Sequence, residues 1–337
     1  MRLYAYRDRF GDQRFGVLVS GRLLTGSQLE KRGGLTIDTR LGIGAMIKLE
    51  PDWQRRLAQA ARRALKAGAP LLDPAKRRPS AAIDAVDLGE KIVGIGLNYA
   101  DHAAEGGRSA PERPLMFAKF ANALVGDWDP VIQHPGTHAM DLEVELGVVI
   151  GRRARRVPVE RAMACVAGYV VANDISARDW QGTPQALHEG EVGDGQWLRA
   201  KGSDTFLPMG SVFVTADEVP DPQALRLWSW IVPGAGKRAG LRAGRETLMQ
   251  EGTTADMIWS VPELIEYISR SITLEPGDII ATGTPSGVGI HRDPPILLQP
   301  GDRVRCEIEG ICSMENPVTE WSDAYDGFDE QDEPAGD

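Results

Sequence analysis

The sequence predicts a β-rich α+β fold, and three observations lead to this class. From Ile92 onward, short apolar runs such as Leu146–Ile150 and Asp278–Thr282 alternate with turns rich in glycine and proline. Few helical patterns intervene, chiefly over Pro158–Cys165 and Pro262–Ser269, whereas a regular βαβ sheet needs a helix between most strands. The 337 residues are 42% hydrophobic and 26% charged, which is typical of folded globular proteins.

Residues 1–87 are expected to form a small N-terminal α/β domain. Leu3–Tyr6 and Phe15–Val19 have the composition of two short strands that pair through a turn. A helical stripe of apolar residues lies between Pro51 and Ala69. The polar, proline-containing stretch Asp73–Ser80 is typical of a linker that leads to a second domain.

The net charge of −10 is distributed unevenly along the chain. Residues 319–337 carry eight acidic residues and no Lys or Arg, so we expect a disordered acidic tail. The remaining 40 acidic and 38 basic residues nearly balance. Residues 1–318, which include the main domain expected over residues 88–318, therefore lack the basic excess that nucleic-acid-binding proteins show.

Compartment signals agree with a cytoplasmic protein that has no membrane partner. No apolar run approaches the ~20 residues of a membrane span, and the N-terminus lacks the order of a signal peptide. Three cysteines, Cys165, Cys306 and Cys312, are too few for a disulfide framework. Cys306 and Cys312 flank the turn of a predicted hairpin and could face each other, although buried thiols are the favoured interpretation.

The segment Asp141–Leu146 alternates acidic and apolar residues, which predicts a strand with Asp141, Glu143 and Glu145 on one face. Adjacent like charges repel unless something neutralises them. A hard divalent cation such as Mg²⁺ or Mn²⁺ does so and prefers oxygen ligands. An isolated alternation of this kind is more often the solvated face of a strand, so a second acidic element is needed.

Asp174 is the candidate for that second element. It follows the apolar run Val170–Ala172, at the point where a strand leaves the core and presents side chains to a cleft. The alternative is that Asp174 caps a following helical turn.

A third element is a short predicted helix over Tyr99–Glu105. His102 and Glu105 share a face at i, i+3 spacing, and a carboxylate beside an imidazole suits a general base. Glycines on both sides would let the segment move as a lid. The alternative is an ordinary surface histidine. No role is expected for the other four histidines, which have no comparable partner: His134, His138, His188 and His291.

Two further segments complete the pattern. Lys201 lies among aromatic and apolar residues, where a cation could polarise a carbonyl group. Thr282–Gly289 follows a strand and offers backbone N–H groups and hydroxyls to a carboxylate. This segment is not a P-loop, because the Gly-Lys-Ser/Thr ending is absent.

Taken in order, these five segments resemble the fumarylacetoacetate hydrolase family, in its acylpyruvase and hydroxymuconate isomerase branch, from about Ile92 to Val318. The resemblance implies a β-roll catalytic domain and a homodimer. It also implies Mg²⁺ or Mn²⁺, with Ca²⁺ as an alternative, on Glu143, Glu145 and Asp174. The same resemblance gives the substrate site Lys201, Gln181, Arg178 and Thr284, and gives the lid the dyad of His102 and Glu105.

Two segments depart from the family pattern. The stretch between Gln181 and Lys201 is longer than expected, and Pro233–Arg245 is expanded and basic. Loops near a site set its shape, so both bear on substrate identity.

The leading interpretation of function is hydrolysis of a C–C bond in an acylpyruvate- or fumarylpyruvate-like β-diketo acid. His102, oriented by Glu105, would activate the water. The alternatives share the metal-stabilised enolate: an isomerase, decarboxylase or hydratase of a 2-keto or 2-hydroxymuconate-type acid. A relative that binds metal and ligand without catalysis is a third class.

Overall fold

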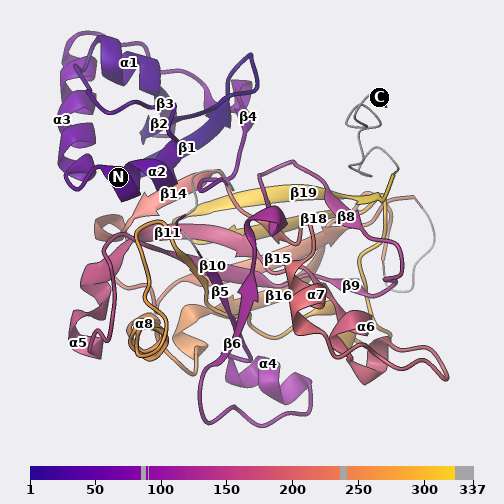
Figure 1. Cartoon of the computed structure of the whole chain (residues 1–337). Coiled ribbons are helices and arrows are strands. Elements are labelled where there is room, and N and C mark those ends of the chain that lie inside the picture. The colour runs from indigo at the N-terminus through magenta and orange to yellow at the C-terminus, as the bar shows by residue number, and fades with distance from the viewer. Residues whose placement is uncertain (85–88, 90, 236–240, 323–337) are drawn as a thin grey trace, which may run out of the picture.

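The computed structural model describes residues 1–84, 89, 91–235 and 241–322. Three predictions fall partly on other residues. The boundary between residues 87 and 88, part of the segment 233–245 and most of the tail at 319–337 lie outside the described residues. Within the described ranges, the chain has the mixed, β-rich α+β architecture that the sequence predicts (Figure 1).

A ten-stranded sheet runs through the molecule and includes the N-terminal strands. Its order is β3-β2-β1-β14-β11-β10-β17-β5-β6, with β4 paired to β1. Because Arg2 of β1 pairs with Val214 of β14, the N-terminal strands continue the sheet of the main domain. The strands are β1 (Arg2–Arg7), β2 (Gln13–Val19), β3 (Arg22–Thr25), β4 (Arg78–Pro79), β5 (Ile92–Gly96), β6 (Leu115–Lys119), β10 (Val144–Ile150), β11 (Val166–Asn173), β14 (Val212–Thr215) and β17 (Ile279–Ala281).

A second sheet of five strands has the order β16-β15-β18-β19-β8. Its strands are β8 (Val131–Gln133), β15 (Arg226–Val232), β16 (Thr247–Thr253), β18 (Arg303–Ile308) and β19 (Cys312–Glu320). Two short pairs lie outside these sheets: β9 (Met140–Asp141) with β12 (Ser176–Ala177), and β7 (Leu124–Val125) with β13 (Leu207–Pro208).

The predicted hairpin around Gly310 is formed by β18 and β19. Its register pairs Cys306 with Met314 and Cys312 with Ile308, so the two cysteines do not face each other. Both are free thiols. Cys306 is buried, in agreement with the favoured interpretation, whereas Cys312 is only partly buried.

Two apolar clusters cover the two faces of the ten-stranded sheet. Leu146 and Val148 of β10 pack in the cluster that also contains Val304 of β18, so this core lies between the two large sheets. Val149 belongs to the other cluster, together with Leu57 of the N-terminal region. All seven residues of β10 are buried, so the acidic alternation that leads into this strand does not mark a solvated face.

Eight α-helices are described. The stripe between Pro51 and Ala69 forms α3, and Gly68 ends it with a φ of +69° that favours glycine. The helix predicted over Pro158–Cys165 is shorter, because a 3₁₀ turn over Met163–Cys165 follows α5. The helices are α1 (Gly26–Lys31), α2 (Gly42–Leu49), α3 (Trp53–Lys66), α4 (Ala100–Glu105), α5 (Val159–Ala162), α6 (Arg178–Gln181), α7 (Trp197–Gly202) and α8 (Val261–Ser269).

The stretch Asp73–Ser80, predicted as a linker, is structured. It contains a 3₁₀ turn over Pro74–Lys76 and strand β4, and the N–H of Ser80 donates to the carbonyl of Ala5 at 3.2 Å. An independent N-terminal domain over residues 1–87 stays a prediction.

Among the residues described, no helix is long and apolar enough to cross a membrane.

Candidate metal centre and active site

The antiparallel neighbours β10 and β11 bring the predicted carboxylates together. Glu143 directly precedes β10, Glu145 is the second residue of β10, and Asp174 directly follows β11. The N–H of Asp174 donates to the carbonyl of Glu143 at 2.9 Å. One carboxylate oxygen from each of the three side chains lies within 4.8 Å of the others. Asp174 does not cap a helix, because α6 begins at Arg178 and its N-cap is Ala177.

Asp141 does not belong to this cluster. Residues 142–143 separate β9 from β10, so the single strand predicted over Asp141–Leu146 is interrupted. The carboxylate of Asp141 instead accepts hydrogen bonds from the N–H groups of Gly289 (2.8 Å) and Ile290 (3.1 Å). It also accepts from Nε of Arg178 at 3.0 Å. Asp141 therefore ties the loop after β17 to one wall of the site.

Glu145 carries a buried oxygen without a hydrogen-bond donor in the described part of the chain. Its Oε2 accepts from the N–H of Gly283 at 3.0 Å, whereas the buried Oε1 has no hydrogen-bond partner among the residues that the structure describes. Burial, Asp174 and Glu143 together raise the pKa of Glu145 well above its ordinary value. A buried carboxylate oxygen without a donor, close to two further carboxylates, is the arrangement that a divalent cation stabilises.

Two cationic side chains contact the same carboxylates. Nζ of Lys201 donates to Oε2 of Glu143 and to Oδ2 of Asp174, each at 2.7 Å, and Nη2 of Arg178 donates to Oε1 of Glu143 at 2.6 Å. Burial lowers the pKa of Lys201, but the negative charges of Asp174 and Glu143 raise it by more. The net shift of this pKa is upward. Burial raises the pKa of Glu143, but Lys201 and Arg178 hold it well below its usual range. Glu143 and Lys201 therefore face each other as a charged pair.

Lys119, which the sequence did not single out, is a further cation at this centre. It is the last residue of β6 and only 2% exposed. Its Nζ lies 2.6 Å from Oδ1 of Asp174 and donates to the carbonyls of Phe206 and Ile175 at 2.7 and 3.4 Å. Burial lowers the pKa of Lys119. The signal that could have identified it is a lysine directly after the short apolar run Leu115–Ala118.

The donor set fits a hard divalent cation such as Mg²⁺ or Mn²⁺, which takes oxygen ligands. Glu143, Glu145 and Asp174 would hold it, and the unpartnered oxygen of Glu145 is available for this purpose. Lys201 competes with such a cation for the oxygens of Glu143 and Asp174, since it lies 2.7 Å from both. Its flexible ammonium group can move aside without a backbone change.

The histidine–glutamate pair forms as the sequence predicts. A hydrogen bond of 2.7 Å joins Nδ1 of His102 to Oε1 of Glu105 on helix α4. Oε2 of Glu105 accepts from the N–H of Gly287 at 2.8 Å, and Gly287 has a φ of +100° that disfavours other residues. His102 is buried, so the alternative of an exposed surface histidine is wrong. The carboxylate fixes the proton of a neutral imidazole on Nδ1 and leaves Nε2 as the base.

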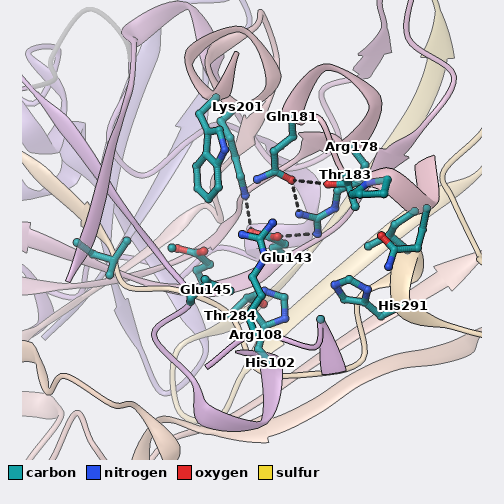
Figure 2. A pocket seen from close by; sticks show the side chains of 18 residues that line it. His102, Arg108, Glu143, Glu145, Arg178, Gln181, Thr183, Lys201, Thr284 and His291 are labelled. Carbon is teal, nitrogen blue, oxygen red and sulfur yellow. Dashed lines mark hydrogen bonds and ion pairs between the residues drawn. The ribbon is translucent and has the colours of Figure 1, made fainter. Parts of the chain in front are cut away.

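A cavity of about 220 Å³ connects these groups. His102 and His291 lie on one side of it, and Lys201 and Gln181 lie on the opposite side (Figure 2). Glu105 and Asp174 each contact a residue that lines the cavity: Glu105 contacts His102, and Asp174 contacts Lys201. The predicted residues that line the cavity are His102, Glu143, Glu145, Arg178, Gln181, Lys201 and Thr284.

Two predicted substrate contacts already have protein partners. The hydroxyl of Thr284 donates to the carbonyl of Val144 at 2.9 Å and accepts from Nε2 of Gln250 at 2.7 Å. Oε1 of Gln181 accepts from Nη1 of Arg178 at 3.1 Å. Substrate roles for Thr284, Gln181 and Arg178 stay predictions.

His291, for which the sequence indicated no role, lines the same cavity. Its ring centroid lies 6.3 Å from that of His102, and burial lowers its pKa. The two histidines are far apart in the chain, and the loop that carries His291 is held by hydrogen bonds from the N–H groups of Gly289 and Ile290 to Asp141. No local pattern could have revealed this neighbour.

Comparisons with known proteins place the chain in a family. The model of the fumarylacetoacetate hydrolase C-terminal domain matches residues 91–319. Mitochondrial oxaloacetate tautomerase FAHD2B of Bos taurus is 44% identical over 229 residues. That match covers 68% of this chain and 66% of the relative, just under two thirds of its length.

Solved structures of the family superpose over nearly the whole chain. Fumarylacetoacetate hydrolase from Exiguobacterium antarcticum has a TM-score of 0.69 and 30% identity, and the match covers 95% of this chain and 100% of that one. The 5-carboxymethyl-2-hydroxymuconate delta-isomerase from Mycobacterium smegmatis has a TM-score of 0.65, 29% identity and coverage of 96% and 100%. Maleylpyruvate hydrolase from Sphingobium sp. SYK-6 has a TM-score of 0.69, 26% identity and coverage of 95% and 100%. The chain belongs to the fumarylacetoacetate hydrolase family.

Proposed function

We propose that this member of the fumarylacetoacetate hydrolase family is a divalent-metal-dependent tautomerase of a small 2-keto acid. The observation that carries the proposal is the pair of imidazoles, His102 and His291, that open on the same cavity as the carboxylate cluster. A tautomerase moves a proton between carbon and oxygen. It therefore needs one group that removes a proton and another that returns one.

The charges of the site suit an anionic substrate. Asp141, Glu143, Glu145 and Asp174 are offset by three buried cations, Lys119, Arg178 and Lys201. When bound, a divalent cation supplies Lewis acidity, which stabilises negative charge that develops on a substrate oxygen. Lys201 lines the cavity and can pair with a substrate carboxylate once it is released from Glu143 and Asp174.

The two imidazoles differ in their partners, which suggests different roles. Glu105 holds His102 with Nε2 free to take a proton from the substrate carbon. His291 has a lowered pKa and is neutral at pH 7, so it can both donate and accept a proton. In our proposal His102 exchanges a proton with the substrate carbon, and His291 exchanges a proton with the substrate oxygen.

Relatives with this activity support the choice. The bovine relative with 44% identity is named an oxaloacetate tautomerase, and a structural relative is named a hydroxymuconate delta-isomerase. Both names describe a proton shift that leaves the carbon skeleton intact. The sequence alone favours hydrolysis. With these relatives we rank tautomerisation first and hydrolysis second.

Hydrolysis of a β-diketo acid is the second candidate, favoured by the His102–Glu105 dyad. A base held by a carboxylate, which is itself fixed by the N–H of Gly287, also suits activation of water. Maleylpyruvate hydrolase has a similar fold. Decarboxylase and hydratase activities would depend on the same metal-stabilised enolate.

Product analysis separates these candidates. Oxaloacetate and acetylpyruvate, each with Mg²⁺ in D₂O, would be followed by ¹H NMR. Accelerated keto–enol interconversion with deuterium at C3 and an intact skeleton is the result that we expect. Pyruvate plus acetate from acetylpyruvate would instead establish the hydrolase, and pyruvate plus CO₂ from oxaloacetate the decarboxylase. Mg²⁺ binding without turnover of either compound would favour the non-catalytic relative.

The role of His291 has its own test. His291→Asn should slow tautomerisation about 10-fold or more, since general acid–base groups are typically worth about 10²–10⁴ in rate. His134→Asn is the matched control, because that histidine bonds the carbonyl of Asp204 and does not line the cavity. If both variants keep the wild-type rate, His291 takes no part in proton transfer.

A further inference from the structure

The long segment between α6 and α7, which the sequence identified as a departure from the family, folds into a projecting loop (Figure 1). It begins at Gly182 with a φ of +80° and contains a 3₁₀ turn over Pro184–Ala186. Its first part reaches the active site, since Thr183, Pro184 and Gln185 line the cavity. Its second part carries exposed His188 and Glu191.

A histidine from another element meets this second part. His138 lies just before β9, and its ring stacks on that of His188 with centroids 4.1 Å apart and an interplanar angle of 17°. Nε2 of His138 lies 3.8 Å from Oε2 of Glu191. One ligand atom from each of His138, His188 and Glu191 lies within 4.8 Å of the others. The sequence indicated no partner for either histidine, and the fold supplies them.

Both sides of the cluster are held by the backbone. The N–H of His188 donates to Oε2 of Glu191 at 2.8 Å, and the N–H of Glu191 donates to the carbonyl of His188 at 3.0 Å. On the other side, Oδ2 of Asp179 accepts from the N–H of His138 at 2.9 Å and lies 3.3 Å from its Nδ1. A carboxylate at one ring nitrogen orients an imidazole for metal binding through the other.

We propose that His138, His188 and Glu191 form a second metal site, which binds a divalent metal ion of borderline softness such as Zn²⁺. Two imidazoles and one carboxylate are ligands that Zn²⁺, Co²⁺ and Ni²⁺ prefer, whereas the carboxylate cluster suits Mg²⁺ or Mn²⁺. Nε2 of His138 exchanges its 2.9 Å hydrogen bond to the carbonyl of Ala186 for the cation. His188 and Glu191 are exposed, so their side chains can turn toward it.

Such a cation links the projecting loop to the start of β9. It thereby restrains the segment that brings Thr183, Pro184 and Gln185 to the cavity. Cation binding should slow proteolysis of the exposed part of the loop around Val192, which is 89% exposed. The second site and the proposed function stand independently, because neither shares a residue with the other.

Zn²⁺ and Co²⁺ binding to the whole chain in excess Mg²⁺ tests the proposal. Wild type and Glu145→Gln should each bind one equivalent of Co²⁺ with the visible absorption of imidazole coordination. His188→Ala and Glu191→Ala should lose about tenfold or more in Zn²⁺ affinity. Glu189→Ala, a neighbouring exposed carboxylate outside the cluster, is the control and should bind as wild type does.

Three results would overturn the second site. They are absence of Zn²⁺ binding to wild type, equal affinity in His188→Ala and the control, and loss of the Co²⁺ spectrum in Glu145→Gln with retention in His188→Ala. Protease protection by Zn²⁺ in wild type but not in His188→Ala is the second readout. It does not depend on the activity of the enzyme.

Discussion

At the residue scale, the carboxylate of Glu145 links metal binding to pH. Burial, Asp174 and Glu143 raise its pKa well above the ordinary value, so the metal-free site holds a proton there at a pH where an ordinary glutamate does not. A cation needs the ionised form, so binding must release that proton.

Mg²⁺ affinity is therefore predicted to keep rising with pH above the range in which an ordinary glutamate ionises, by up to about tenfold per pH unit for one released proton. The direction follows because a raised pKa keeps the competing proton bound until the pH exceeds it. Calorimetric titrations at pH 6.5, 7.5 and 8.5, in buffers of different ionisation enthalpy, measure both affinity and proton release. A dissociation constant that does not change with pH, with no proton release, would show that Glu145 is not a ligand.

His102 is predicted to act in chemistry and not in folding. His102→Asn should lower kcat by about 10²–10⁴, the usual contribution of a positioned acid–base group. Mg²⁺ binding and thermal stability should stay close to those of wild type, because the carboxylate cluster is untouched. Steady-state kinetics beside calorimetry checks this, and an equal loss of metal affinity would assign His102 a structural role.

Several residues of the site could be predicted because their signal is local. Glu143 and Glu145 differ by two positions, and His102 and Glu105 by three, so strand or helix geometry alone pairs them. Lys119 and His291 could not be predicted in this way. They reach the site only through contacts across the fold, to Asp174 and beside His102 respectively.

At the scale of elements, Asp141 connects strand β9 to the loop that carries His291. Its buried carboxylate accepts from Gly289 N–H, Ile290 N–H and Arg178 Nε. Asp141→Asn removes a charge that pairs with a buried guanidinium, which should cost about 3 kcal/mol. It should also raise KM, because the loop loses a charged acceptor and Arg178 keeps only Glu143 as its carboxylate partner among the described residues.

Urea denaturation and steady-state kinetics measure the two effects. Asp204→Asn, which changes an exposed carboxylate, is the control for stability. An unchanged midpoint in Asp141→Asn would mean that this carboxylate does not hold the loop.

The regular elements were the most predictable part of the fold. The hairpin β18–β19, helix α3 and helix α8 follow from turn residues, apolar periodicity and caps, which are local. The interruption of the strand after Asp141 was not predictable, because the N–H groups of Leu142 and Glu143 donate to side-chain oxygens of Asp141 and Asn173 and not to the backbone of a neighbouring strand. The stretch Asp73–Ser80 resembles a linker in composition, yet pairing with β1 makes part of it a strand.

At the scale of the whole molecule, the N-terminal strands extend the main sheet. Deletion of residues 1–84 would expose the edge of β14 and the apolar side chain of Phe213, which packs against Trp53. Unpaired strand edges and apolar patches promote association. The truncated chain is therefore predicted to aggregate or to lose its cooperative transition.

Size-exclusion chromatography and thermal melts of the truncated and full chains test this prediction. A soluble, cooperatively folding product that keeps the stability of the full chain would support residues 1–87 as an independent domain. The chromatogram of the full chain also tests the predicted homodimer. Cell fractionation tests the predicted cytoplasmic location.

The central claim is that Glu143, Glu145 and Asp174 hold the cation on which turnover of a 2-keto acid depends. The most direct measurement is the rate of keto–enol interconversion of oxaloacetate by EDTA-treated enzyme as Mg²⁺ is added back, for wild type beside Glu145→Gln. Our account predicts that the treated wild type is inactive and regains its rate with Mg²⁺, whereas the isosteric variant does not. Full activity of the metal-free wild type, or equal recovery of both proteins, would contradict it.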